Sequence, residues 1–521
     1  MNVDENECLS ESVIEKNKKN AESVPGLSFR DSMPQIVASC VINLIVIQAG
    51  INMAFSSILI PQLSLPDSDI KIDLDSSSTV ASIVTLSIAF GALICGPLMD
   101  KYGRKRLSTI ICVPFMFAWL LIALSRNLFM IYTARVLSGF CGGLTTVALV
   151  YVSEISSPQN RGMLLCLNSV AVSLGIILTY FFNIFFQWRT IGFIYAFISL
   201  LSLLIIMRIP ESPSWILVFS TKKQHSQALI SLEWIYRKRH LSTFYYHQLI
   251  DNEKLRQSNL EGNETAAAKE RESFMPLLAK VFRQPQVYKP LIILLFMFLF
   301  QQCSGCYILI FYTINIFRNL SLNFSQRINE NMALMLLGAL RLVVSVIASG
   351  LARKCHRKTL LYISSLGMMT FIFASGILVR NMDGFTDTSN FLTFQETSND
   401  TLMDNEEKQQ QFNTEVYLLV TILCYIAFSS LGVMILPWTL ISELFPIEVK
   451  GKMSGIIVLI AYFIMFFAVK IFPYSLNMYG MEVMFYLFAI SSFAFCTFVY
   501  YFLPETYGKS LNDIQKHFTK Q

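Results

Sequence analysis

Two adjacent glutamines, Gln301 and Gln302, lie near the middle of an apolar run over residues 288–312. That run is long enough to cross a bilayer, which takes about 20 helical residues. A side-chain amide both donates and accepts hydrogen bonds, so a pair of amides suits a ligand covered with hydroxyl groups. Because unpaired amides are costly in lipid, we expect this pair to face a polar ligand in a cavity; hydrogen bonding between helices is the alternative.

An arginine, Arg341, lies inside another apolar run, over residues 332–351. A guanidinium at that depth must face water, protein or an anion. The sequence leaves two interpretations open. Arg341 either binds an anionic group of a substrate, or pairs with a carbonyl or carboxylate and narrows a cavity.

A charged turn separates the apolar runs over residues 79–99 and 107–124. Asp100 precedes Gly103, which suits a tight turn, and the cations Arg104, Lys105 and Arg106 follow directly. Because Lys and Arg are retained on the cytoplasmic side of a membrane, this turn predicts the orientation of every later helix.

Other kinds of chemistry are not recognisable in the sequence. It contains no nucleophile placed beside a base, no phosphate-binding glycine loop and no residues with metal-ligand spacing. We therefore expect no enzymatic activity, no cofactor and no metal. Most cysteines lie in apolar runs, where a thiol behaves as a small hydrophobic group, so we expect no structural disulfide.

Composition indicates a membrane protein. The chain has 521 residues, of which 54% are hydrophobic and only 15% are charged, whereas about 25% charged residues is usual for a soluble domain. The net charge of +6 comes mostly from short loops, as expected for a protein with the lipid bilayer as its surroundings. This pattern argues against binding to nucleic acid.

Twelve apolar runs predict twelve transmembrane helices and an all-α membrane protein. Their connections alternate in charge, and the basic ones place both termini in the cytoplasm. The expected organisation is a cytoplasmic tail (1–34), a six-helix bundle (35–208), a cytoplasmic linker with short helices (209–287), a second six-helix bundle (288–503) and a cytoplasmic tail (504–521). The runs are 35–58, 79–99, 107–124, 128–150, 163–185, 190–208, 288–312, 332–351, 359–379, 415–438, 453–472 and 481–503.

Glycosylation sequons agree with this topology. Asn319, Asn323 and Asn399 each begin an Asn-x-Ser/Thr motif in a loop predicted to lie outside the cell. Asn263 begins a fourth motif in the cytoplasmic linker and should stay unmodified.

Several motifs, in order along the whole chain, resemble those of the sugar-porter branch of the major facilitator superfamily. Features in residues 50–57 and 311–313 are similar to the insect facilitated trehalose transporters. The resemblance implies two pseudo-symmetric six-helix bundles around a central site. It also implies facilitated transport of a sugar across the plasma membrane by alternating access, by a monomer. The motifs are Gly96 to Arg106, Tyr151 to Glu154 with Arg161-Gly162, Pro210-Glu211-Ser-Pro213, Gln301 to Gly305, Gly432 to Pro446, and Pro504-Glu505-Thr506.

The resemblance also assigns a gating role to charged residues. They would form ion pairs at the cytoplasmic face that hold the two halves together in the outward-open state; the alternative is that they only orient helices. Arg353 and His356 depart from the family pattern in the second half. The gating set is Asp100, Arg104, Glu154 and Arg161 in the first half, and Arg357, Glu443 and Lys450 in the second.

The sugar site implied by the resemblance is divergent. Gln301, Gln302 and Trp438 match family positions that bind substrate, whereas Ser169, Tyr307, Arg341 and Ala461 stand where the family has amides. Two competing hypotheses follow: a carrier of an anionic or less polar solute, and a transport-inactive sugar sensor. The first predicted helix, 35–58, holds no Asp, Glu or His. Proton-coupled relatives usually have a carboxylate there, so we expect passive transport.

Overall fold

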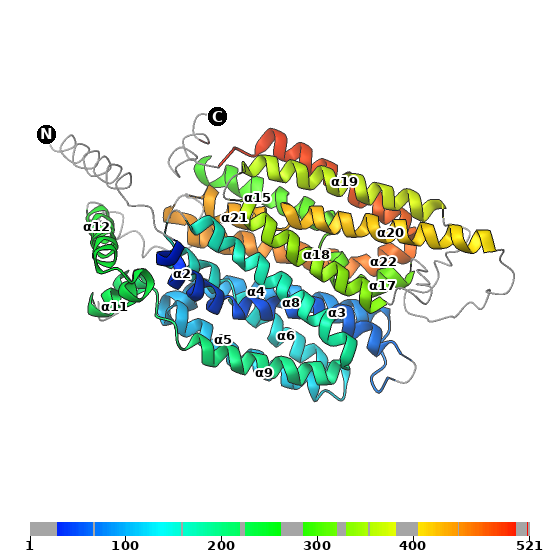
Figure 1. Cartoon of the computed structure of the whole chain (residues 1–521), viewed down its shortest axis with the longest axis horizontal. Coiled ribbons are helices and arrows are strands. Elements are labelled where there is room, and N and C mark those ends of the chain that lie inside the picture. The colour runs from blue at the N-terminus through cyan, green and yellow to red at the C-terminus, as the bar shows by residue number, and fades with distance from the viewer. Residues whose placement is uncertain are drawn as a thin grey trace.

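The computed structural model is a bundle of long helices (Figure 1). It describes residues 29–65, 68–157, 160–218, 225–261, 285–319, 330–352, 355–381, 405–445, 447–506 and 518. Within these ranges the secondary structure is helical and no strand is present. The predicted linker residue Asn263, the loop residues Asn323 and Asn399, and Arg353 lie outside the described residues.

The first half of the chain forms one set of membrane-length helices. Local sequence sets where some of them begin: the side chain of Asp73 caps α4 by accepting a hydrogen bond from the Ser76 amide (2.9 Å), and Asn127 caps α6 through the Met130 amide (2.9 Å). The helices are α2 (Phe29–Ile42), α3 (Leu44–Leu63), α4 (Leu74–Tyr102), α5 (Arg104–Ala123), α6 (Leu128–Leu144), α7 (Val147–Ile155), α8 (Arg161–Phe185) and α9 (Trp188–Ile206).

Three helices of the predicted linker follow: α10 (Pro213–Val218), α11 (His225–Tyr236) and α12 (Arg239–Glu261). Figure 1 shows α11 and α12 beyond one end of the bundle, beside α2. Lys238 binds Asp31 of α2 (2.6 Å), and the rings of Tyr236 and Tyr245 stack at 4.3 Å. Burial raises the pKa of the Tyr245 phenol, so this stack stays neutral.

The second half repeats the arrangement of long helices, and Figure 1 shows it packed along the length of the first half. Gly480, with a φ of 76°, divides α22 into two segments. Eleven stretches of the described residues are long and apolar enough to cross a membrane, and the last of them, 453–502, contains this break. The helices are α15 (Pro285–Cys303), α16 (Ile308–Phe311), α17 (Thr313–Asn319), α18 (Glu330–Leu351), α19 (Arg357–Asn381), α20 (Asn405–Leu431), α21 (Leu436–Leu444) and α22 (Ile447–Phe502).

The structure therefore confirms the predicted all-α membrane fold, but four predicted spans are not single helices. The first run, 35–58, is interrupted between α2 and α3. The runs 128–150, 288–312 and 415–438 are interrupted between α6 and α7, α15 and α16, and α20 and α21. The break after α15 includes Gly305, whose φ of +82° is strained for any residue with a Cβ. Hydropathy averaged over a whole span does not reveal such breaks, because each break is only one to four residues long.

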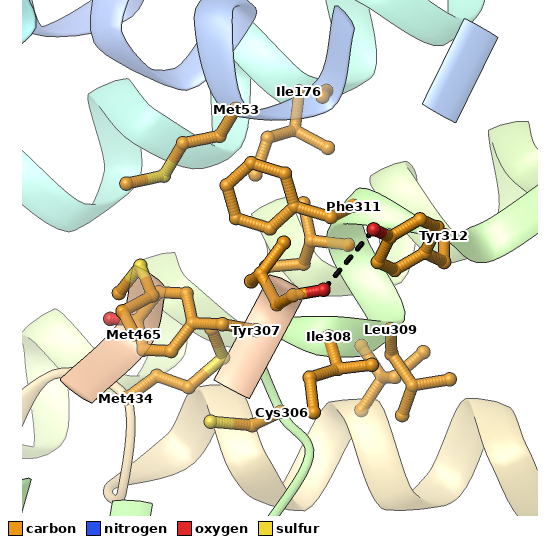
Figure 2. Packing of buried hydrophobic residues seen from close by; sticks show 14 of the residues in the cluster. Met53, Ile176, Cys306, Tyr307, Ile308, Leu309, Phe311, Tyr312, Met434 and Met465 are labelled. Carbon is orange, nitrogen blue, oxygen red and sulfur yellow. Dashed lines mark hydrogen bonds between the residues drawn. The ribbon is translucent and has the colours of Figure 1, made fainter. Parts of the chain in front are cut away.

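One apolar cluster joins both halves. In Figure 2, Met53 and Ile176 of the first half face Tyr307, Phe311, Met434 and Met465 of the second. Close approach within a half depends on glycine: a Cβ at Gly175 of α8 would lie 2.3 Å from the Ile47 carbonyl oxygen of α3. The close-packed core positions the breaks in α15 and α20 next to the first half.

The bundle has two ends, which we name after residues that lie there. The Asp75 end carries the start of α4, the end of α8 and the start of α9. The Arg104 end carries the start of α5, and α10 to α12 follow there. The two halves meet along α4 and α22, and along α8 and α18.

Candidate functional site

The two glutamines lie on the last turn of α15 and face protein. Gln301 and Gln302 are 0% and 1% exposed. The Gln301 amide Nε2 donates to the Val433 carbonyl oxygen (2.5 Å), which belongs to the break between α20 and α21. Gln302 Nε2 reaches Gln301 Oε1 at 3.5 Å, while Gln302 Oε1 is buried and has no hydrogen-bond partner in the described part of the chain. The pair thus leaves one buried acceptor available to a donor.

Aromatic side chains lie beside these amides. The Trp438 indole Nε1 donates to the Tyr307 hydroxyl (3.0 Å), and the Trp438 ring packs against Phe298 with centroids 4.8 Å apart. Ala461 lines a narrow apolar hollow together with Phe298, and this hollow is too small to admit a water molecule. An apolar lining offers no hydrogen bond to a hydroxyl, as expected where Ala461 replaces an amide. The other residues lining the hollow are Leu295, Ile457 and Ile460.

Arg341 of α18 reaches across to the first half. Its Nε donates to the Ser173 hydroxyl of α8 (3.3 Å), and its Nη1 lies 3.5 Å from the Met434 sulfur. The Ser173 hydroxyl also contacts Ser345 (2.9 Å) and donates to the Ser169 carbonyl oxygen (3.0 Å). The structure therefore brings Arg341 and the half-buried Ser169 to one polar contact between α8 and α18.

A second group of charges surrounds Arg104 at the other predicted site. Its guanidinium lies 3.3 Å from Asp100 and 2.9 Å from Glu154, and its Nε also donates to Glu154 (3.1 Å). The second Glu154 oxygen accepts from the Ser212 hydroxyl. These contacts join α4, α5, α7 and the residues before α10, all on the first-half side of the chain.

Sequence analysis left Glu211 without a role, and the structure places it at the start of α5. Its carboxylate accepts hydrogen bonds from the backbone amides of Arg104 (2.9 Å), Lys105 (2.8 Å) and Arg106 (3.3 Å) at the start of α5. An anion at a helix N-terminus satisfies free amides and interacts favourably with the helix dipole. The Pro210-Glu211 motif was visible in the sequence, but its partner 107 residues earlier was not.

Glu505 repeats this arrangement in the second half. It accepts from the backbone amides of Arg357 (3.1 Å) and Lys358 (3.2 Å) at the start of α19. The Arg357 guanidinium donates to the Ala352 carbonyl (2.6 Å), just as Arg104 donates to the Met99 carbonyl (3.1 Å), in both cases five residues earlier. The two halves therefore share a local structure as well as a helix order.

The remaining predicted residues are placed as follows. Arg161 is exposed at the start of α8, and a Cβ on the neighbouring Gly162 would lie 4.0 Å from Arg357 Nη2. Glu443 lies in α21 and Lys450 in α22, with side chains outside the described set. Asn319, predicted to lie in a loop, is the last residue of α17.

The Asp75 end carries a contact between the halves that sequence analysis missed. Lys470 of α22 binds Asp75 of α4 (2.6 Å) and also donates to the hydroxyls of Ser78 (3.0 Å) and Thr79 (2.7 Å). The Tyr474 hydroxyl donates to the same Asp75 oxygen (2.7 Å). Because 395 residues separate Lys470 from Asp75, no local pattern could reveal the pair.

Comparisons with known proteins place the chain in a family. It is 26% identical over 484 residues to the facilitated trehalose transporter Tret1 of Polypedilum vanderplanki, covering 92% of this chain and 87% of that protein. The Tret1 of Apis mellifera ligustica is also 26% identical, covering 93% of this chain and 88% of that protein.

Solved structures share the fold. The proton:xylose symporter XylE bound to 6-bromo-6-deoxy-D-glucose has a TM-score of 0.68 at 18% identity, covering 94% of this chain and 100% of that chain. The human organic anion transporter MFSD10 has a TM-score of 0.54 at 12% identity, covering 89% and 99%. The family model described as "Sugar (and other) transporter" matches residues 48–518. This protein therefore belongs to the sugar transporter family and has the major facilitator fold.

Proposed function

We propose that this protein carries a sugar, trehalose or a hexose, across the plasma membrane by facilitated diffusion. The observation that carries the proposal is the buried, unpaired Oε1 of Gln302 beside Gln301, because a sugar hydroxyl is the donor it lacks. The relatives named facilitated trehalose transporters support the same class of substrate. In this proposal the chain is a monomeric carrier and not an enzyme.

Alternating access gives the two ends their roles. In this conformation Lys470 and Asp75 hold the halves together at the Asp75 end, which we assign to the outside of the cell. The basic residues at the start of α5 support assignment of the Arg104 end, and of both chain termini, to the cytoplasm. The bundles over 35–208 and 288–503 would then rock about Gln301, Gln302, Trp438, Tyr307 and Arg341.

Uptake of labelled trehalose and glucose into oocytes tests the proposal. Gln302→Ala should lower sugar uptake about tenfold or more, because it removes the amide that a buried hydroxyl would bind. Gln187→Ala is the matched control, because Gln187 is exposed at the start of α9. Surface expression should be equal for both variants.

Unchanged uptake by Gln302→Ala would contradict the assigned site. Sugar binding without flux in the unmodified protein would contradict transport itself and would favour the sensor hypothesis.

A further inference from the structure

Two of the buried arginines, Arg135 and Arg341, lie between apolar helices away from the Arg104 end, and only Arg135 has a full set of partners. Arg135 of α6 is 0% exposed. Its Nη1 donates to the backbone oxygen (3.0 Å) and side-chain oxygen (2.7 Å) of Asn52, its Nε lies 3.5 Å from the Val80 carbonyl, and its Nη2 donates to Ser56. The guanidinium also lies 5.9 Å from the Phe55 ring. Arg135 is therefore held by a complete set of partners inside the first half.

Arg341 is almost as deeply buried, at 6% exposure, but has far weaker partners. The Ser173 hydroxyl at 3.3 Å is its single oxygen partner among the described residues, and its other contact is the Met434 thioether. A thioether is a weak acceptor, and a guanidinium has five N–H donors. No carboxylate of the described residues forms an ion pair with it.

Among the described residues, no charged group near Arg341 could balance its charge. The groups close enough to interact with it electrostatically are the phenols of Tyr307 and Tyr180 and the thiol of Cys306, which are neutral at physiological pH. A cation removed from water is costly unless an anion and hydrogen bonds compensate it. An anion arriving with the substrate would supply both, and Arg341 lies at the meeting of the two halves.

We propose that the transported sugar carries an anionic group, a carboxylate or a phosphate, and that Arg341 binds this group between α18 and α8. This inference rests on the proposed transport function. Gln302 Oε1 would accept from a hydroxyl of the same ligand, while the guanidinium binds the anion through donors that now face only Ser173 and Met434. Since Ser173 belongs to the first half, an anion there would contact both halves at once.

Proteoliposomes with the purified full-length protein test the inference. Glucose, glucuronate and glucose 6-phosphate share one ring and differ in charge. Uptake of at least one anion should exceed that of glucose by about tenfold, as expected for a charge-assisted contact. An inside-positive membrane potential should raise the accumulation of the anion and leave that of glucose unchanged, since only the anion moves charge inward.

Variants separate anion binding from a structural role. Arg341→Gln should remove the preference for the anion and its response to potential, while Arg341→Lys keeps the positive charge and should retain part of both. Arg189→Gln is the matched control, because Arg189 pairs with Asp69 at the surface. Binding is also measured without flux, as the rise in melting temperature that each compound causes in the purified protein.

The outcomes distinguish this inference from the proposed function. Glucose flux with neither uptake of an anion nor a rise in melting temperature would overturn the inference and leave sugar transport standing. An anion preference unchanged in Arg341→Gln would overturn the role of Arg341. A rise in melting temperature with the anions alone, lost in Arg341→Gln and without flux of any compound, would support anion binding by Arg341 but would overturn transport of the anion and the proposed function. No response to any of the three compounds would overturn both.

Discussion

The two ends of the bundle use ion pairs in opposite ways. At the Asp75 end, Lys470 and Asp75 join α22 to α4, and their side chains are 27% and 71% exposed. At the Arg104 end, the side chains of Arg104 and Glu154 are 5% and 17% exposed, and their mutual contact joins helices of one half. A contact between halves must break in every transport cycle, so a solvated and weak pair suits it. A contact that keeps one half rigid can be buried and strong.

The largest effect is expected from Arg104→Gln. This change breaks the ion pairs that Arg104 forms with Asp100 and Glu154. It leaves the Glu154 carboxylate buried without its cation. We expect a loss of about 3 kcal/mol in the free energy of unfolding, the scale for breaking a buried pair from one side. Thermal unfolding of the purified protein measures the loss.

Two variants make this test specific. Arg106→Gln should have little effect, because the Arg106 side chain is exposed although it lies two residues away. Adding Glu154→Gln to Arg104→Gln should restore part of the stability, since it removes the uncompensated charge. A small loss of unfolding free energy in Arg104→Gln alone would show that the ion pairs at the Arg104 end are no stronger than the pair at the Asp75 end.

Removing the helix caps at the Arg104 end should reduce stability less. Comparing the cap of each half tests whether the two halves are equivalent at this end. Glu211→Ala removes the acceptor for three amides of α5, and Glu505→Ala removes the acceptor for two amides of α19. Each should cost about 1 kcal/mol, as losing a capping side chain does, with the larger loss for Glu211. Melting temperatures of both variants test this, and Glu233→Ala on α11 is the control. If Glu505→Ala has no effect while Glu211→Ala does, the two halves are not equivalent at this end.

The parts of the structure that could be predicted are those encoded locally. A membrane crossing is a property of about 20 consecutive residues, so hydropathy located the spans and composition excluded a soluble fold. Gln301 and Gln302 stood out for the same reason, since two amides in an apolar run are unusual on their own. The resemblance to a known family predicted that Asp100, Arg104 and Glu154 interact. The structure shows how: both carboxylates contact the Arg104 guanidinium.

The parts that could not be predicted depend on packing between distant segments. The pairing of Lys470 with Asp75 and the cap that Glu211 provides both join residues more than a hundred positions apart. The breaks in the predicted spans depend on backbone angles such as that of Gly305 and on contacts with neighbouring helices. Arg135 has hydrogen-bond partners for each of its nitrogens, whereas Arg341 has few. Only the positions of neighbouring side chains reveal this difference.

The smallest effect is expected at the Asp75 end itself. Lys470→Met removes the cation while keeping an apolar stem of similar length, and Tyr474 still donates to Asp75. The population open at this end should rise by roughly twofold to fivefold, as for other exposed pairs. High salt should raise the open population of the unmodified protein part of the way toward that of the variant, because it screens solvated charges.

Labelling by a membrane-impermeant maleimide measures this opening. The reporter is Asn183→Cys on α8, in a background where the exposed Cys40 and Cys303 are serine. This change also removes the Asn183 hydrogen bond to Asn331 of α18 (3.0 Å), so Lys470 and Lys470→Met are compared in proteins that both carry it. Lys71→Met, an exposed lysine in the neighbouring loop, should leave the labelling rate unchanged. A rise of about a hundredfold in Lys470→Met would mean that this pair alone holds the halves together. The exposed pair would then be as strong as the buried one, and burial would not separate the contacts that break from those that persist.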